Sequence, residues 1–346
     1  MNKKHIVTTI GVVLLTTGVI GGIISGINAM PSLISKYDEM QSEFNENQVL
    51  YDGELNISKL SVELPVSHIE IRHHDKSNIL VERVGNKDVS NITINDENNE
   101  LIISEENKKV KQDAKNVDDI VQQIIDEIYT NDMSTIVVYL PKEIDIDVKT
   151  INGHLNVEKD VVSDTLSFET NNGNISLDPS LSFKNLNIRS KYDISLSTSE
   201  MYGIENIKVE SSCVYIHDGS SIYEDLEIPN KVNIVVSDND YYQSVNIDTN
   251  LPIAKNLTIN SNSSVGLDLP ILKYKFNFNI SALSGISYES SDYDKYTGTP
   301  LEKYFNENDE DENVIKREFI GVMNKSMLES ADEYIVNIDC DSVTFE

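Results

Sequence analysis

Stretches of alternating hydrophobic and polar residues recur along the chain from Ile146 onward, at intervals of about twenty residues. In each stretch two apolar residues stand two positions apart, which places both side chains on one face of a β-strand. The first series of pairs is Ile146/Val148, Leu166/Phe168, Leu186/Ile188, Ile207/Val209, Leu226/Ile228, Val245/Ile247, Val265/Leu267 and Ile286/Tyr288. A second series interleaves with it: Leu155/Val157, Ile175/Leu177, Ile194/Leu196, Val214/Ile216, Ile234/Val236, Leu257/Ile259 and Phe276/Phe278. Such a period is typical of stacked repeat architectures.

A unit of two short strands cannot bury its apolar face alone, whereas stacked copies form a continuous core. Strands stacked in parallel lie about 4.8 Å apart, so we expect successive coils at that separation. The sequence therefore predicts an all-β fold, a β-helix-like parallel β-solenoid with coils of about 20 residues. In this fold Phe168 and Ile188 point inward as structural core residues, and intervening residues such as Asp147, Ser167 and Asn187 face solvent.

An antiparallel meander is the alternative to this solenoid. Asn152-Gly153 and Asn172-Gly173 each separate two alternating stretches, and Asn-Gly is the strongest short signal for a β-hairpin. The equivalent positions later in the chain hold Lys191-Tyr192, Ser211-Ser212 and Pro229-Asn230, which suit the positive φ angles of a hairpin turn poorly. A solenoid corner needs only a bend, so we expect Gly153 and Gly173 to be structural residues at such corners.

The chain before Ile146 has longer alternating strands, consistent with an all-β module that caps the first coil. These strands are Leu55–Leu64, Ile69–Arg72, Ile79–Val84, Ile92–Ile94, Leu101–Ser104 and Ile136–Leu140. Residues 114–130 have apolar side chains at helical spacing and predict an inserted amphipathic helix that covers a solenoid end or binds a partner. Residues 289–313 predict a mobile acidic loop. We assign residues 49–346 to the β-repeat domain.

The N-terminus carries the strongest local signal, because residues 6 to 27 contain no charged side chain. A helix of that length spans about 30 Å, the thickness of the hydrocarbon core. We therefore predict a single transmembrane anchor within residues 1–29 and a polar stalk over residues 30–48. A cleavable signal peptide that ends near Ala29 is the alternative. Lys3 and Lys4 precede the segment, so the N-terminus is expected in the cytoplasm and the large domain outside the cell membrane.

Charge and cysteine content exclude several functional classes. The chain has 28 basic and 58 acidic residues, a net charge of −30, which makes nucleic acid an improbable partner because phosphate binding requires a basic face. Two cysteines, Cys213 and Cys340, cannot form a disulfide scaffold or a four-cysteine zinc site. In a linear stack at least four coils separate them, about 20 Å, so no disulfide is expected.

Several segments are similar to a known family. Leu60-Ser61-Val62-Glu63-Leu64, Val137-Val138-Tyr139-Leu140-Pro141 and Ile146-Asp147-Val148 through Asn152-Gly153 resemble motifs of the bacterial DUF4097 family, whose members are often labelled adhesins. His154 replaces the aspartate usual after the glycine, and Cys340-Asp341-Ser342-Val343 replaces a glycine-rich ending. The resemblance covers residues 55–346. It implies a β-helix-like domain at the cell envelope, linked in some members to envelope-stress operons, and it implies no catalytic residues.

Two kinds of candidate chemistry arise from individual side chains. Aspartates on one solenoid edge could bind Ca²⁺ or act as an acid/base pair on a glycoside; the candidates are Asp145, Asp147, Asp160, Asp164, Asp178, Asp193, Asp218, Asp225, Asp238 and Asp240. No aspartate position repeats in register in the two series, and aspartate also favours turns. His73 and His74 point to opposite faces if they lie on a strand, so a polar turn is favoured over a metal site. We therefore expect no catalytic, cofactor or metal site, with Ca²⁺ as a weak alternative.

Two functions from different classes remain. The first is a non-catalytic, membrane-tethered extracytoplasmic solenoid, an adhesin or envelope scaffold that presents one face to a cell-wall polymer or an envelope protein. The alternative is a carbohydrate-active β-helix enzyme that acts on an envelope or extracellular glycan. The two differ in what the solenoid face should carry: a plain polar surface for the first, and a carboxylate-lined cleft with convergent Arg or Lys for the second.

Overall fold

The computed structural model describes residues 47–54, 57–84, 91–106, 135–141, 143–219, 227–236, 244–271, 273–288, 296–306, 317–323 and 332–346. The predicted anchor, nearly all of the predicted stalk and the predicted helix over residues 114–130 lie outside these ranges. Within them, no helix has the length and apolar character needed to cross a membrane.

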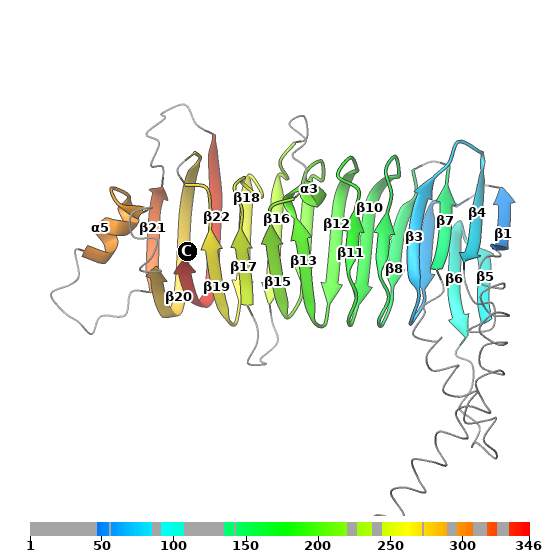
Figure 1. Ribbon diagram of the computed structural model, residues 1–346, viewed down its shortest axis with the longest axis horizontal. Helices are drawn as coiled ribbons and strands as arrows, with labels where there is room; N and C mark the ends of the chain where they lie inside the picture. The colour runs from blue at the N-terminus through cyan, green and yellow to red at the C-terminus, as the bar shows by residue number, and fades with distance from the viewer. Residues whose placement is uncertain are drawn as a thin grey trace, which may run out of the picture.

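The central part of the molecule is a stack of coils, each with one strand on either of two faces (Figure 1). The first face contains β8 (Asp145–Lys149), β10 (Val162–Thr170), β12 (Ser182–Ser190), β14 (Asn206–Glu210), β16 (Lys231–Val236) and β18 (Asn256–Ser261). The second face contains β9 (Leu155–Val157), β11 (Ile175–Leu177), β13 (Asp193–Ser197), β15 (Cys213–His217), β17 (Ser244–Asp248) and β19 (Ser264–Asp268). Neighbouring strands on the first face are parallel and in register, with Leu166 beside Ile146 and Leu186. The all-β, solenoid-like stack is confirmed, and the meander is excluded for these coils.

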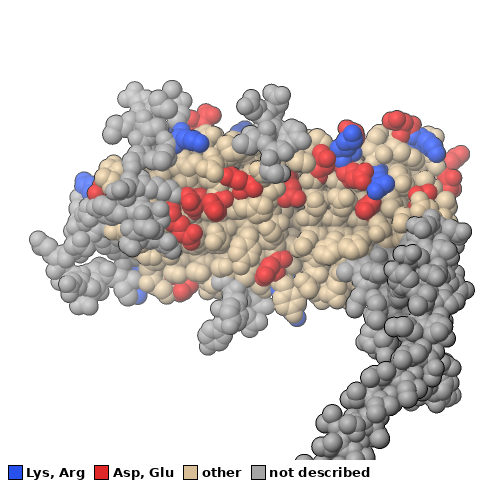
Figure 2. Space-filling model, in the orientation of Figure 1, with Lys and Arg blue, Asp and Glu red and all other residues tan. Residues whose placement is uncertain are grey.

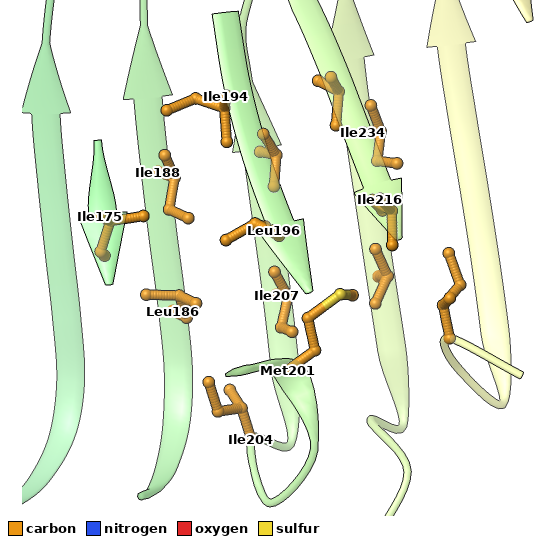
Figure 3. Close-up of a cluster of buried hydrophobic side chains, with 14 of the residues drawn as sticks. Ile175, Leu186, Ile188, Ile194, Leu196, Met201, Ile204, Ile207, Ile216 and Ile234 are labelled. Atoms are coloured by element: carbon orange, nitrogen blue, oxygen red, sulfur yellow. The ribbon is translucent and has the colours of Figure 1, made fainter. Parts of the chain in front are cut away.

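The core occupies the space between the two faces. It is built from the apolar pairs of the strands, in which both side chains point inward. Phe168 and Ile188 are neighbours in register on β10 and β12, and their side chains are 1% and 2% exposed. Figure 3 shows Leu186 and Ile188 on β12 in one buried cluster with Ile194 and Leu196 on β13. Because burying such a side chain contributes about 1.5–3 kcal/mol, the repeated pairs are the main source of stability.

The corners bring the backbones of adjacent coils into close contact. A Cβ atom added at Gly173 would collide with the carbonyl oxygen of Gly153, and one at Gly153 would collide with the carbonyl oxygen of Ser67. Neither glycine has a positive φ, so glycine is required here for close approach and not for a hairpin turn. The buried Thr150 hydroxyl donates to the Pro65 carbonyl oxygen at 3.3 Å and links the corner to the preceding coil. Hydroxyl residues repeat at this corner position as Thr170, Ser190, Ser211 and Ser261.

The predicted assignment of strands to the two series is correct through Ile216 and wrong after it. Val245/Ile247 and Val265/Leu267 were expected beside Ile207 but lie on the second face, whereas Ile234 and Leu257 lie on the first. The physical reason is a longer connection, because β14 and β16 begin at residues 206 and 231, which is 25 residues apart. A prediction with a fixed period of twenty residues therefore assigns the later strands to the wrong face. Ile228 precedes β16 outside any strand, and Leu226 lies beyond the described residues.

The hydrogen-bonded ladder on the second face is interrupted between β11 and β13, which end two separate sheets. The short helix α3 (Thr198–Met201) follows β13 at this point. Its Glu200 carboxylate accepts hydrogen bonds from the backbone N–H of Leu177 at 3.3 Å and of Ser197 at 2.8 Å. The Glu200 side chain thus replaces a strand partner as the hydrogen-bond acceptor for these two backbone N–H groups.

The N-terminal end extends the stack but in an order that differs from the sequence. β2 (Lys59–Glu63) and β3 (His68–His73) lie beside β8 and β9, and the later strands β6 (Glu100–Glu106) and β7 (Thr135–Leu140) lie beyond them. β4 (Asn78–Val84) and β5 (Asn91–Glu97) then cover this end as antiparallel strands, and β1 (Gln48–Glu54) pairs with β4. A strand lies at each predicted position, but four of these strands continue the parallel stack and do not cap its first coil.

The C-terminal end repeats this out-of-order arrangement. The last strand, β22 (Glu333–Phe345), inserts between β18 and β19 on one side and the earlier β20 (Lys275–Tyr288) on the other. β21 (Glu318–Met323) then covers β20 as an antiparallel strand. Part of the predicted acidic loop is ordered as α5 (Pro300–Asn306), and Tyr296 and Leu301 are buried there. That part of the loop prediction is wrong because these apolar side chains pack on the end of the stack.

The insertion of β22 also shortens the separation of the two cysteines. β22 follows β15, β17 and β19 in strand order, so three strand spacings, about 14 Å, separate Cys213 from the coil that holds Cys340. The sequence predicted four or more. Both thiols are buried, and burial raises the pKa of the Cys340 thiol to about 12.

We predict that Phe168→Ala lowers the free energy of unfolding by about 3–5 kcal/mol, because it removes a buried ring and leaves a cavity. Ser167→Ala, one residue away on the outer surface, should change it by less than about 0.5 kcal/mol. Chemical denaturation of the two variants beside the wild type measures both values. Equal losses would contradict the assignment of inward and outward side chains.

We also predict that both cysteines remain thiols in the native protein, because a disulfide needs Cα atoms within about 7 Å. Iodoacetamide without reductant should modify neither thiol rapidly in the folded protein and both after unfolding in guanidinium, as counted by mass spectrometry. An intramolecular disulfide in the unfolded sample would show that the chain doubles back and that the strand order is wrong.

Candidate functional site

A row of alternating charges runs across the outer surface of the first face. Lys149 on β8, Glu169 on β10, Arg189 on β12 and Glu210 on β14 are neighbours in register, one on each strand. Glu63 on β2 stands beside Lys149 in the same row. We call these five side chains the charge ridge. The stack creates the ridge because residues one coil apart on parallel strands lie only about 4.8 Å from each other.

Ion pairs form between ridge residues and between the ridge and the neighbouring Lys208. The Arg189 Nη2 atom lies 2.7 Å from Glu210 Oε2, and the Lys208 Nζ atom lies 2.5 Å from Glu210 Oε1. Lys149 Nζ lies 3.6 Å from Glu63 Oε1. Hydrogen bonds from Lys208 and Arg189 hold the pKa of the Glu210 carboxyl below its usual range, and the bond to Glu210 raises the pKa of Arg189. Glu210 and Arg189 are therefore held in their charged forms, and ion pairs engage Glu63, Lys149, Arg189 and Glu210.

Two hollows lie on either side of the ridge. The strand hollow, about 330 Å³, lies over Ser167 and Asn187 with Asp147 and Lys208 at its two ends. The corner hollow, about 310 Å³, lies over the corner residues Thr170, Ser190 and Ser211. Glu169, Arg189 and Glu210 line both hollows.

The strand hollow exists because short side chains alternate with long ones in neighbouring rows. Ser167 and Asn187 are consecutive members of one row, and the Asn187 amide donates to the Ser167 hydroxyl at 3.5 Å. The longer side chains of Glu169 and Arg189 rise beside them in the next row. The predicted core residues Phe168 and Ile188 form the floor, since they lie between the two rows and point inward. Gly153 and Gly173 lie at the corners and not in either hollow.

The carboxyl group of Glu210 is unsuited to acid catalysis. A glycosidase needs one carboxylic acid whose pKa is raised so that it can protonate the leaving group. Among the described residues, the carboxyl groups whose pKa departs from the ordinary value are all lowered, each by hydrogen bonds from neighbouring side chains; they are Glu100, Asp164, Glu210 and Glu333. On this surface Glu210 is thus an ionised carboxylate paired with two convergent cations, Arg189 and Lys208.

The aspartates singled out from the sequence do not form a metal centre in the described part of the chain, where no three His, Cys, Asp or Glu side chains are grouped to hold an ion. One expectation about them was wrong, because Asp248 and Asp268 are neighbours in register on β17 and β19. The repeat was visible in the sequence, because Val245/Ile247 and Val265/Leu267 are consecutive pairs of the predicted first series and an aspartate follows each of them. Figure 2 shows acidic side chains gathered on the visible face across the region of β13 to β19.

The histidines considered as metal ligands have separate partners. His74 Nε2 lies 2.6 Å from the Asn78 carbonyl oxygen, and His73 Nε2 lies 3.5 Å from Asp75 Oδ1. A different pair does meet, since the rings of His68 and His154 stack with centroids 4.8 Å apart. Burial, followed by the neighbouring His154, lowers the pKa of His68. His73 is the last residue of β3, and the polar bend before β4 begins only after it.

Sequence reasoning missed the charge ridge as a site. The signal was present, because Lys149, Glu169, Arg189 and Glu210 are spaced by 20, 20 and 21 residues. The predicted solvent-facing positions Asp147, Ser167, Asn187 and Lys208 stand two residues earlier in the same strands, and they form the adjoining row. Reading both rows together would have shown one surface.

Comparison with known proteins gives one family and several solved structures, two of which are described below. No curated protein matches the chain. A "putative adhesin" from Bacteroides fragilis is 13% identical over 87% of this chain and 96% of its own, with a TM-score of 0.38. A "putative cell adhesion protein" from Clostridium sporogenes is 13% identical over 87% of this chain and 98% of its own, with a TM-score of 0.23. The Toastrack DUF4097 family model matches residues 57–316, so the chain belongs to the Toastrack DUF4097 family.

Proposed function

We propose that this protein is a non-catalytic module of the cell envelope, tethered to the cell membrane by its N-terminal segment, with the solenoid-like domain outside the cell. The uncharged run from residue 6 to 27 and the preceding Lys3 and Lys4 support this topology. The resemblance to a family of envelope proteins supports the same location. In this position the stack acts as an adhesin or scaffold that presents its first face to a cell-wall polymer or an envelope protein.

The observation that carries this proposal is the charge ridge with its two flanking hollows. The surface is extended over consecutive strands, and its charged groups are held in place by ion pairs. A row of side chains fixed at strand spacing suits recognition of an extended partner, because binding groups on rigid elements need little ordering when the partner arrives.

The glycan-cleaving alternative receives no support from this surface. The convergent Arg and Lys that it required are present, but they keep Glu210 ionised instead of leaving a neutral acid. We therefore propose binding without cleavage.

The topology is tested by adding protease to intact, wall-stripped cells. We expect the large domain to be removed and a short fragment to remain in the membrane, detected by an antibody against an N-terminal tag. A cytoplasmic protein that survives in the same sample serves as the control for intact cells. Protection of the large domain would contradict the proposed location, and a mature protein beginning at Met30 would contradict the tether while leaving export in place.

A further inference from the structure

The strand hollow has no net charge, although the protein as a whole is strongly acidic. Three cations, Lys149, Arg189 and Lys208, and three carboxylates, Asp147, Glu169 and Glu210, line it. The whole chain has a net charge of −30. A balanced surface on such an acidic protein disfavours a polyanionic partner, because the surrounding field repels it and the hollow offers no excess of positive charge.

The cations of the hollow are already engaged by the protein's own carboxylates. Arg189 pairs with Glu210, Lys208 pairs with the same carboxylate, and Lys149 pairs with Glu63. Asp147 is likewise 3.5 Å from Lys59. A charged ligand would have to break these pairs, and the gain from exchanging one carboxylate for another is small at an exposed surface. A neutral ligand leaves the pairs intact.

The paired groups still have hydrogen-bonding capacity for hydroxyl groups. Arg189 has five N–H donors, and its contacts with Glu210 involve only Nε and Nη2. Ionised carboxylates accept several hydrogen bonds each, and the Ser167 hydroxyl and Asn187 amide can both donate and accept. Donors and acceptors therefore alternate along the hollow, as a ligand rich in hydroxyl groups requires.

The hollow is also periodic in the direction of the stack. It is lined from β8, β10, β12 and β14, so equivalent positions recur at the strand spacing of about 4.8 Å. A hexose in an extended β-linked chain advances by roughly this spacing. Successive sugars can then meet equivalent positions on successive strands of the stack. The volume of about 330 Å³ lies at the lower end of the range for small-molecule sites.

We propose that the strand hollow binds an extended, uncharged polysaccharide laid along the stack across β8, β10, β12 and β14. This inference rests on the proposed function, because it names the envelope polymer that the first face would contact. Arg189, Glu210 and Asn187 hydrogen-bond to the sugar hydroxyls. The ion pair holds Arg189 and Glu210 in position, and the hydrogen bond to Ser167 holds Asn187.

The test uses the full-length protein in detergent micelles and three probes: chitohexaose, cellohexaose and the anionic hexamer of galacturonic acid. Titration calorimetry should show saturable binding of at least one uncharged hexamer. Raising sodium chloride from about 50 to about 500 mM should change this affinity by less than about twofold, because no net charge is neutralised. The anionic hexamer should bind at least about tenfold more weakly.

Matched variants locate the site. Ser167→Tyr fills the strand hollow and should weaken binding by at least about tenfold. Ser176→Tyr adds the same ring to the exposed surface of β11 on the second face, away from the hollow, and should leave the affinity within about twofold of the wild type. Thermal unfolding of both variants checks the fold. If Ser167→Tyr unfolds, Asn187→Ala replaces it and should still weaken binding several-fold.

Three results would overturn the inference: no saturable binding of either uncharged hexamer, equal effects of Ser167→Tyr and Ser176→Tyr, or salt-sensitive binding that favours the anionic hexamer. Each is independent of the protease experiment on cells. A domain found outside the cell that binds no sugar removes this inference and leaves the proposed function, whereas a domain found inside removes the proposed function even if sugar binds in solution.

Discussion

The structure depends on one constraint, the in-register hydrogen bonding of parallel strands about 4.8 Å apart. Because each coil repeats the position of the one before it, an inward residue always stacks on an inward residue, as Phe168 does on Val148 and Ile188. The same constraint brings corner backbones so close that Gly153 and Gly173 cannot carry a side chain. It also gathers residues about twenty positions apart into rows on the outer surface. Core, corners and candidate site are thus three consequences of one ladder.

A parallel stack leaves unpaired backbone groups at both ends, which are liable to pair with other chains. Both ends of this stack are finished in the same way, with the outermost coil made from strands that come out of sequence order. An antiparallel strand then lies outside each of them: β4 and β5 at the N-terminal end, and β21 at the C-terminal end. Tyr51 on β1 reaches across the N-terminal end, where its hydroxyl donates to Asp96 Oδ2 on β5 at 3.1 Å. These antiparallel strands pair with the edges of the parallel sheets and so protect the edges from pairing with other chains.

The sequence was informative where the period was regular and misleading where it changed. From Ile146 to Ile216 the spacing alone gave the strands, their inward residues and their faces correctly. It failed after Ile216 because the connections lengthen, to 25 residues from the start of β14 to that of β16 and 31 from the start of β15 to that of β17, which no fixed period can represent. The position of β22 could not be predicted either, because strand order at an end is decided by which edges pair in space and not by local pattern.

The candidate site was partly predictable for the same reason. The outward positions of Ser167 and Asn187 followed from the alternation, and the spacing of Lys149, Glu169, Arg189 and Glu210 implied a row. What the spacing could not give is the hollow, because its shape depends on short and long side chains in two adjacent rows. Nor could it give the pairing of Glu210 with both Arg189 and Lys208, which determines that the surface is neutral and internally satisfied.

Engineered disulfide trapping between neighbouring coils tests the in-register parallel ladder most directly. Ser167 and Asn187 are neighbours on β10 and β12, so the double variant Ser167→Cys/Asn187→Cys should form a disulfide rapidly under mild oxidation. In a hairpin centred on Asn172-Gly173, Ser167 would instead lie opposite Asp178. Rapid trapping of the first pair and none of Ser167→Cys/Asp178→Cys, measured by mass spectrometry, is the result that the parallel stack predicts. Trapping of the second pair in preference to the first would contradict it.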